Sequence, residues 1–247
     1  MFAIYIYFDG KECKQMGENL DFGSQTLIPL FEVNGNTLGI TQTHVNTWII
    51  MAVLTIFALI VRAKIKNFKE VPDSKFQNLV ETMVELLNNF TANTMGKDKK
   101  GFAAFYGPLF IFIIICNLSG LVGLRPPTAD FATTLAFALT TFFMIHGFGV
   151  KAKGPGYFKF LMEPFPFLLP INLIGEIATP ISLSFRLFGN ILGGTIIMGL
   201  VYAMFPWFLT LIGVPAALHM YFDIFAGSLQ AFIFVMLSMT FVSGAME

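Results

Sequence analysis

Five apolar stretches, each long enough to cross a lipid bilayer, constrain this chain more than any other feature of its sequence. The first three cover residues 44–61, 103–124 and 131–150. Because an α-helix rises about 1.5 Å per residue, roughly 20 apolar residues span the hydrocarbon core of a membrane. With 55% hydrophobic and only 12% charged residues, the chain is also too apolar for a water-soluble protein. The sequence therefore predicts an all-α integral membrane protein.

The last two apolar stretches are much longer than one perpendicular crossing requires. They cover residues 167–205 and 207–246, with Pro206 between them. At about 1.5 Å per residue, a helix of roughly 39 residues extends about 58 Å, nearly twice the hydrocarbon thickness. Each stretch therefore either folds back on itself or crosses the membrane at a strong tilt.

Residues 74–96 predict an amphipathic helix rather than a membrane span. Ser74 is followed three residues later by Gln77, a capping-box pattern, and apolar residues then recur at helical spacing. Acidic and amide side chains, among them Glu81 and Glu85, interrupt the segment too often for a crossing. We expect this helix to lie at the membrane surface or against partner proteins.

Residues 1–43 show no sustained periodicity and predict a water-exposed N-terminal segment with a turn at residues 34–36. The short apolar patch at residues 1–8 has no basic region or cleavage site, which argues against a removable signal peptide. Cys13 and Cys116 are too few and too far apart to predict a disulfide framework or a metal cluster. The zero net charge gives no support for nucleic-acid binding.

The basic residues outside the apolar stretches predict the orientation of the chain. If each stretch crosses the membrane once, 11 of them fall on one side and 3 on the other. By the positive-inside rule, the richer side is cytoplasmic. We therefore expect the N-terminus outside, and the amphipathic helix and the C-terminus in the cytoplasm. The larger set is Arg62, Lys64, Lys66, Lys69, Lys75, Lys97, Lys99, Lys100, Lys151, Lys153 and Lys159, and the smaller is Lys11, Lys14 and Arg125.

Three ionisable residues lie deep inside the two long stretches: Glu176, Arg186 and Asp223. An arginine at the bilayer centre costs about 2.5–3.5 kcal/mol on insertion scales, so such residues usually line a water-filled path or face a partner. Snorkelling to an interface is the alternative, but apolar-rich sequence extends on both sides of Arg186. Glu176 lies ten residues earlier, about 80° around an ideal helix, so we expect it to face a different path.

A small and polar helix face surrounds Arg186. Ser182, Arg186, Asn190 and the pair Gly193 and Gly194 recur at spacings of four and of seven to eight residues, which places them on one side of a helix. Small residues on a charged face allow another helix to approach closely. Packing between helices of the same chain is the alternative, although it would not require an arginine.

The last stretch carries a polar stripe. His219 and Asp223 are four residues apart, as are Asp223 and Gly227, and Gln230 follows Asp223 by seven, with Ser228 between them. One interpretation is a buried hydrogen bond between His219 and Asp223 that only satisfies the two groups. The other is the wall of an aqueous half-channel, in which these groups exchange protons or ligate a cation.

Three motifs in these stretches resemble a known family. They are residues 168–176 (LLPINLIGE), residues 180–190 (PISLSFRLFGN) and residues 228–234 (SLQAFIF). These motifs resemble subunit a of the bacterial-type rotary (F-type) ATP synthases, and the resemblance extends from the first span to the C-terminus. It implies five membrane helices plus one amphipathic helix on the cytoplasmic side. The last two membrane helices would be long and strongly tilted, and each would cross once.

The resemblance also implies a function. The family's essential arginine falls on Arg186 and its channel-associated glutamine on Gln230, whereas Thr195 stands where many members carry an acid and Asp223 where others carry histidine. The family is a non-catalytic stator subunit that needs no cofactor. Its two half-channels carry protons or sodium ions to and from the carboxylates of the rotating c-ring. The implied partners are the ring of c subunits, the peripheral-stalk b subunits, the remaining ATP synthase subunits and the lipid of a bacterial plasma membrane.

The sequence leaves the coupling ion open between the proton and sodium. Sodium would favour hard oxygen ligands, for which the candidates are Asn172, Glu176, Thr179, Asp223 and Ser228. Two other classes of membrane protein compete with the stator subunit. A stand-alone secondary transporter or channel often shows internal repeats, and we find no convincing repeat. A membrane-embedded hydrolase would need a nucleophile–base or metal signature, and none of the usual ones is present.

Overall fold

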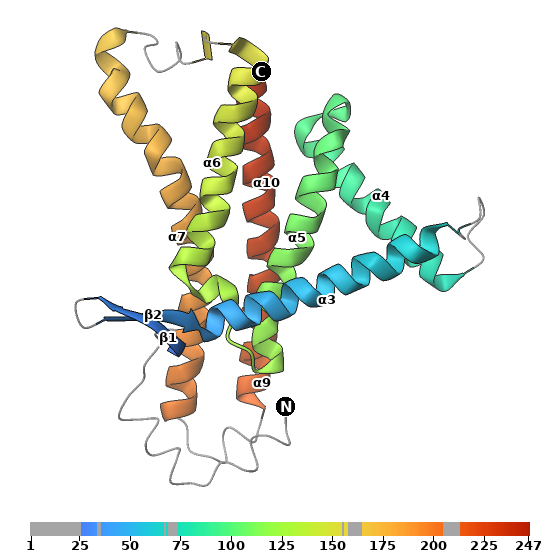
Figure 1. Ribbon diagram of the computed structural model, residues 1–247, viewed down its shortest axis with the longest axis vertical. Coiled ribbons are helices and arrows are strands. Elements are labelled where there is room, and N and C mark those ends of the chain that lie inside the picture. Colours follow the sequence, from blue (N-terminus) through green and yellow to red (C-terminus); the bar gives the residue numbers. More distant parts are fainter. Residues whose placement is uncertain are drawn as a thin grey trace.

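The computed structural model describes residues 26–33, 36–66, 68, 74–154, 156–157, 165–204 and 213–247. In this part of the chain, five helices are long and apolar enough to cross a membrane, which confirms the predicted all-α membrane fold. In Figure 1, α5, α6 and α10 follow the long axis of the molecule, α7 is inclined to them, and α3 runs across them. In chain order the elements are β1 (Thr26–Val33), β2 (Asn36–Thr41), α3 (Gln42–Ile65), α4 (Lys75–Met95), the 3-10 segment η1 (Lys97–Phe102), α5 (Ala103–Leu118), the 3-10 segments η2 (Ser119–Val122) and η3 (Pro127–Ala129), α6 (Phe131–Lys153), the 3-10 segment η5 (Pro166–Leu168), α7 (Leu169–Met204), α9 (Val214–His219), the π-helical segment η6 (Met220–Ala226) and α10 (Gly227–Met246).

A two-stranded antiparallel hairpin, β1 and β2, precedes the first membrane helix. The sequence shows no apolar alternation that would have predicted these strands. The turn predicted at residues 34–36 falls between them, and its residues 34–35 lie outside the described part, as do residues 1–25. At the start of α3, Thr41 Oγ1 lies 2.6 Å from Nδ1 of His44, so the hairpin leads directly into a capped helix.

The buried residues of helix α3 lie in its first turns, and its last turn contacts α4, where Lys64 Nζ lies 4.7 Å from the centroid of the Phe76 ring. Thr43, Asn46 and Ile50 are its buried residues, and Asn46 Nδ2 donates a hydrogen bond of 3.0 Å to the backbone oxygen of Arg125. Beyond Ile50 most of its side chains are exposed, and most of these are apolar. An apolar surface of this size needs lipid or another protein to cover it.

Helix α4 confirms the predicted amphipathic helix. Ser74 Oγ accepts a hydrogen bond of 3.2 Å from the backbone N–H of Gln77, as the capping pattern requires. The Gln77 side chain donates a hydrogen bond of 2.7 Å to Glu81 Oε1. Gly96 ends the helix at a φ of 99°, a conformation that glycine adopts readily.

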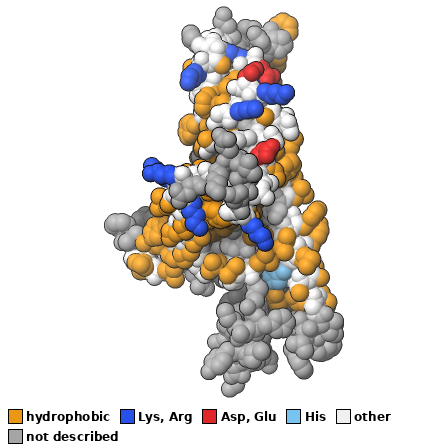
Figure 2. Space-filling view, turned by 90° about the vertical axis from the view of Figure 1, so that its right-hand side faces the viewer, with side chains coloured by type: hydrophobic (Ala, Val, Ile, Leu, Met, Phe, Trp, Pro, Cys, Tyr) orange, Lys and Arg blue, Asp and Glu red, His pale blue; other side chains and the backbone are white. Residues whose placement is uncertain are grey.

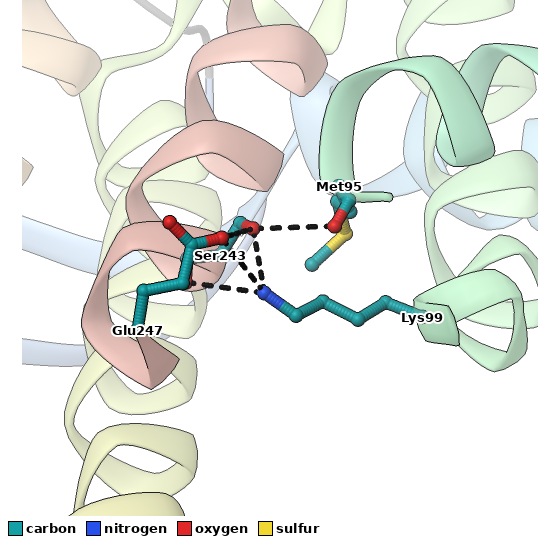
Figure 3. Close-up of polar contacts among 4 residues, drawn as sticks. All are labelled: Met95, Lys99, Ser243 and Glu247. Atoms are coloured by element: carbon teal, nitrogen blue, oxygen red, sulfur yellow. Dashed lines mark hydrogen bonds and ion pairs between the residues drawn. The ribbon is translucent and has the colours of Figure 1, made fainter. Parts of the chain in front are cut away.

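The turn after α4 holds the C-terminal end of α10 (Figure 3). Lys99 Nζ donates a hydrogen bond of 2.9 Å to Ser243 Oγ and forms an ion pair of 3.2 Å with Glu247 Oε1. Ser243 Oγ in turn lies 3.4 Å from the carbonyl oxygen of Met95. The hydrogen bond from Lys99 lowers the pKa of the exposed Glu247 carboxyl below its ordinary value. These contacts tie α4 and η1 to the last helix.

Each long apolar stretch forms one helix rather than a hairpin. Helix α7 continues without a break from Leu169 to Met204, inclined to α6 in Figure 1. The other stretch runs as one span from Val214 to Met246 through α9, η6 and α10. Residues 205–212 between them lie outside the described part. The prediction of one long helix per stretch is confirmed.

The core of the bundle lies between α5, α6, α7 and α10. Its fully buried side chains include Tyr106, Ile113 and Phe234. Hydroxyl groups also link the helices: Thr141 Oγ1 lies 2.9 Å from Ser238 Oγ, which donates to the Tyr106 hydroxyl at 3.3 Å. In a membrane, close packing and such interhelical hydrogen bonds, worth about 0.6 kcal/mol each on average, hold helices together.

Lysines mark one end of the bundle. Lys97, Lys99 and Lys100 lie in η1, and Lys151 and Lys153 in the last turn of α6. We call this the lysine-rich end, and the end that carries η2 and η3 the opposite end. Figure 2 shows one face of the molecule, where hydrophobic side chains cover much of the described surface and charged ones gather in its upper half and middle. This pattern fits a protein embedded in lipid.

Candidate functional site

Arg186 lies near the middle of α7, on a face that the rest of the chain leaves open. Its side chain is exposed and, within the described part of the chain, forms no hydrogen bond or ion pair. A Cβ added at Gly189 or Gly193 would meet no atom within 4 Å. On the other side of the helix, Leu183 and Leu187 are buried, at 3% and 0% exposure. The predicted small and charged face is therefore open to an approaching helix at Arg186, Gly189 and Gly193. Gly194 is the exception, because it is buried and a Cβ there would lie 3.4 Å from Phe222 of the last helix.

The other predicted residues of α7 are Ser182, which is exposed, and Asn190 and Thr195, which form hydrogen bonds. Ser182 is exposed one turn before Arg186. Asn190, one turn after it, donates a hydrogen bond of 3.3 Å from Nδ2 to the backbone oxygen of Ala226, so it links α7 to the last helix. Thr195 donates its hydroxyl to a carbonyl of its own helix. Of these residues, Asn190 alone reaches the last helix through a described hydrogen bond.

His219 joins a carboxylate and a tyrosine. Its Nδ1 lies 2.6 Å from Asp223 Oδ2, and its Nε2 lies 2.9 Å from the hydroxyl of Tyr202. The predicted pair of His219 and Asp223 is thus confirmed, whereas Tyr202, near the end of α7, was missed. The side chains of His219 and Asp223 remain 24% and 20% exposed. An imidazole bonded on both nitrogens and still open to water is suited to passing protons.

The irregular segment η6 places Asp223 at the opposite end. Such π-helical segments are rare and occur often at functional sites. The backbone oxygen of Gly227, just after η6, accepts a hydrogen bond of 2.8 Å from Asn117 Nδ2. The amide oxygen of Asn117 accepts another of 2.7 Å from Thr128. A Cβ added at Gly120 would lie 3.5 Å from Asp223 Oδ2. Residues of α5, η2 and η3 therefore hold this part of the last helix.

Glu176 lies toward the lysine-rich end. Its Oε2 is 3.7 Å from Nε2 of His146 in α6, and Nδ1 of His146 is 3.3 Å from the hydroxyl of Tyr157. The ten residues between Glu176 and Arg186 correspond to about 15 Å along the helix. The sequence singled out Glu176, as a group facing its own path, but missed His146 and Tyr157. The structure thus contains a second tyrosine–histidine–carboxylate cluster, at the other end of the bundle.

Gln230 lies inside the bundle with an unsatisfied amide. It is 6% exposed, and among the described residues its Nε2 has no hydrogen-bond partner. Buried polar atoms without a partner are rare in folded proteins. No described hydrogen bond joins Gln230 to Arg186, so the structure of the isolated chain does not pair the two residues that the family resemblance singled out.

The hard oxygen groups considered for sodium do not form one site. Among the described residues, no three His, Cys, Asp or Glu side chains lie together in a way that could hold a metal ion. Glu176 contacts His146 toward the lysine-rich end, whereas Asp223 lies beside Gly120 at the opposite end. Thr179 donates its hydroxyl to a carbonyl of its own helix. The two acids therefore belong to separate clusters.

Comparison with known proteins finds one family over most of the chain. The family described as "ATP synthase A chain" matches residues 44–243. The chain belongs to the ATP synthase subunit a family. A relative from Propionigenium modestum, named "ATP synthase subunit a, sodium ion specific", is 36% identical over 223 residues, covering 83% of this chain and 74% of the relative. Two others are named "ATP synthase subunit a". The one from Moorella thermoacetica is 35% identical over 206 residues, covering 83% of this chain and 90% of the relative. The one from Nitratidesulfovibrio vulgaris is 39% identical over 207 residues, covering 81% and 84%.

Family membership confirms what the motifs of the two long stretches implied. The chain is the ion-conducting stator subunit of the membrane sector of an ATP synthase. It is a multi-pass bacterial membrane protein, whose described residues form five helices able to span the bilayer, and it acts in a complex with other ATP synthase subunits.

Proposed function

We propose that Arg186 is the fixed positive charge that separates two ion paths and meets the carboxylates of a rotating ring of c subunits. The observation that carries this proposal is its position, exposed on the open face of α7 and without a hydrogen-bond or ion-pair partner among the described residues. An unpaired guanidinium in a bilayer is costly, so it needs an opposite charge from outside the chain. A ring carboxylate passing along the glycines of this face supplies that charge.

Two routes are proposed to reach this face from opposite ends of the bundle. The outer route contains Tyr202, His219 and Asp223, which are joined by hydrogen bonds. It approaches Arg186 through Asn190, which bonds to the last helix and lies about 6 Å from Arg186 along α7. The inner route contains Glu176, about 15 Å away in the other direction. The charge of Arg186 lies between the two routes.

The mechanism follows from the energy of charge in lipid. A ring carboxylate must be neutral to travel through hydrocarbon, so it carries a bound ion there. A guanidinium stays protonated at physiological pH, and Arg186 therefore favours the ionised carboxylate and the release of its ion into one route. Beyond Arg186 the carboxylate takes up an ion from the other route. The fixed charge also repels cations that would cross directly, so transport is coupled to rotation.

The remaining predicted residues are assigned to the same face or to its borders. Ser182 and Asn190 line the side of α7 that the ring passes, and Thr195 borders the outer route. Gln230 supplies an unsatisfied amide donor inside the bundle, which we assign to the hydrogen bonding of the path. None of these groups carries a charge, so their substitution is expected to slow transport rather than to abolish its coupling.

Orientation and partners complete the proposal. The positive-inside rule places the lysine-rich end in the cytoplasm, so the C-terminus is cytoplasmic and the N-terminus outside. Lipid and the peripheral-stalk b subunits are proposed to cover the exposed apolar sides of α3 and α4. We infer that the coupling ion is the proton, although one relative is named sodium ion specific. The support is that both clusters are built around histidine rather than around the hard oxygen ligands that sodium prefers.

The proposal is tested by Arg186→Ala in the complete ATP synthase, with Arg62→Ala as the matched control. Arg62 is an exposed arginine of the same chain in the last turn of α3. We expect Arg186→Ala to abolish ATP-driven ion pumping and ATP synthesis in membrane vesicles, while ATP hydrolysis by the detached catalytic part continues. Arg62→Ala should pump at close to the normal rate. Coupled transport near normal in Arg186→Ala would contradict the proposal.

A further inference from the structure

His146 is held between two groups that can exchange protons with it. Its Nδ1 lies 3.3 Å from the hydroxyl of Tyr157, within hydrogen-bond range, and its Nε2 lies 3.7 Å from Glu176 Oε2. The second distance is too long for a hydrogen bond, but one bridging water or a small rotation of the glutamate would close it. The imidazole is therefore positioned to contact both neighbours, one on each nitrogen.

The packing around the ring fixes this arrangement. Phe142, one turn earlier in α6, meets the imidazole edge-on, with ring centroids 4.2 Å apart. The ring of Tyr157, which is 5% exposed, lies directly on the backbone of Gly149. A Cβ at that position would come within 2.6 Å of its Cζ. Only glycine leaves the space that the tyrosine ring fills, so Tyr157 and His146 are held in contact.

The Tyr157 hydroxyl keeps its proton at neutral pH. Burial first, and then the negative charge of Glu176, raise the pKa of Tyr157 above its ordinary value. A phenol hydroxyl can both donate and accept a hydrogen bond. Tyr157 can therefore stabilise either tautomer of His146, with the ring proton on Nδ1 or on Nε2. A group that stabilises both tautomers allows the imidazole to take up a proton on one nitrogen and release it from the other.

We propose that His146 is a proton relay between Glu176 and the solution at the lysine-rich end, with Tyr157 as its positioning residue. This inference rests on the proposed function, which assigns Glu176 to the inner route. It adds the next group along that route. Among the described titratable groups, Tyr157, from the turn after α6, and Glu176, from α7, lie against the His146 ring.

Each transfer leaves the relay as it began. Protonated Glu176 gives its proton to Nε2 of the tautomer whose Nδ1–H bonds to Tyr157, which leaves a carboxylate and an imidazolium. The imidazolium then releases its Nδ1 proton to water, and neutral His146 remains. The Tyr157 hydroxyl then donates to Nδ1. Water resets the ring by giving a proton to Nδ1 and taking one from Nε2, and the hydroxyl turns back to accept from Nδ1–H. One proton enters and one leaves, and the sequence also runs in reverse when ATP hydrolysis drives the ring.

The position in the helix fits a relay near the water boundary. His146 lies five residues before Lys151, or about 7–8 Å along α6. Its side chain is 21% exposed, and that of Glu176 is 27% exposed. A partly exposed imidazole beside the carboxyl group offers its proton a second way to reach water.

The test measures ATP-driven proton pumping by the whole ATP synthase in inverted membrane vesicles. His146→Ala should lower the pumping rate about a hundredfold, the lower end of the range that a positioned proton-transfer group contributes. Millimolar imidazole in the buffer should restore much of it, because a free imidazole can occupy the vacated space and carry the proton. The control is His44→Ala, since His44 lies exposed at the start of α3. Tyr157→Phe should slow pumping severalfold and increase the difference between rates in H₂O and D₂O.

The outcomes separate this inference from the proposed function. If Arg186→Ala abolishes coupling while His146→Ala pumps within twofold of normal, the relay is refuted and the proposed function stands. A slow His146→Ala that imidazole does not restore assigns His146 a structural role and also refutes the relay. If Arg186→Ala remains coupled, both proposals fail. Should His146→Ala not assemble with the complex, His146→Gln, which cannot carry a proton, must show the loss, and normal pumping by it refutes the relay.

Discussion

Replacing Gly149 by alanine should break the contact between Tyr157 and His146 without touching either residue. A Cβ at Gly149 would lie 2.6 Å from Cζ and 2.9 Å from Cδ2 of Tyr157. The ring must therefore retreat by about 1 Å before an ordinary carbon contact is reached. The bond from Tyr157 to His146 is already 3.3 Å long, so a shift of this size takes it beyond hydrogen-bond range.

The matched control for this change is Gly147→Ala. Gly147 lies in the same helix, and a Cβ there would meet no atom within 4 Å. Both substitutions gain up to about 1 kcal/mol of helix propensity, whereas overpacking at Gly149 costs about 1–3 kcal/mol. We therefore expect Gly149→Ala to be less stable than Gly147→Ala by roughly 1–3 kcal/mol, measured as the free energy of unfolding in a detergent titration.

The same pair of variants gives a functional readout. Gly149→Ala should pump protons as slowly as Tyr157→Phe, because both remove the hydroxyl from His146, and Gly147→Ala should pump normally. Equal stability and equal pumping rates for the two glycine variants would refute the reasoning. A slow Gly147→Ala would show instead that α6 tolerates no added side chain on either face.

Three further predictions follow from other contacts. Tyr202→Phe should slow pumping several-fold, because it loses the 2.9 Å hydrogen bond to His219, which is worth about 1 kcal/mol. The control is Tyr221→Phe, at an exposed tyrosine with aromatic contacts, which should pump normally. Equal pumping rates for the two variants would contradict the prediction. Asp223→Asn should impair transport by blocking the outer route, and a normal rate would remove Asp223 from it. Lys99→Ala should raise the pKa of Glu247 toward that of an ordinary glutamate, because the hydrogen bond from Lys99 lowers it. The ion pair between Lys99 and Glu247 therefore contributes its full stability above the ordinary pKa of a glutamate and loses it as the pH falls through the lowered pKa of Glu247. Carboxyl-carbon NMR would measure the pKa of Glu247, and an unchanged pKa in Lys99→Ala would show that the pairing is absent.

Local sequence signals predicted the helices and the face of Arg186. Helix α4 begins after its cap at Ser74 and ends at Gly96, almost at the predicted residues, because capping depends on neighbouring residues. The pair of His219 and Asp223 followed from their spacing of four residues on a helix. Such features arise within one element, so the sequence contains enough information to predict them.

The sequence did not predict the contacts between elements that lie far apart in the chain. His146 is a single histidine in an apolar span, and neither its spacing nor its neighbours point to Tyr157 or Glu176. Tyr202 contacts a histidine 17 residues away across a change of helix. The π-helical segment η6 has no sequence signature that distinguishes it from α-helix. These arrangements depend on how α6, α7 and the last helix pack, and the periodicity of one helix does not report that packing.

The central claim is that the open face of α7 carrying Arg186 lies against the ring. Gly189→Cys places a thiol on that face, where an added Cβ meets no atom. Phe143→Cys places one on α6, at a side chain that is 68% exposed. With a second cysteine beside the ring carboxylate, we predict that oxidation cross-links Gly189→Cys to a c subunit and leaves Phe143→Cys uncross-linked. Cross-linking from Phe143→Cys alone, or none from an accessible Gly189→Cys, would contradict the account.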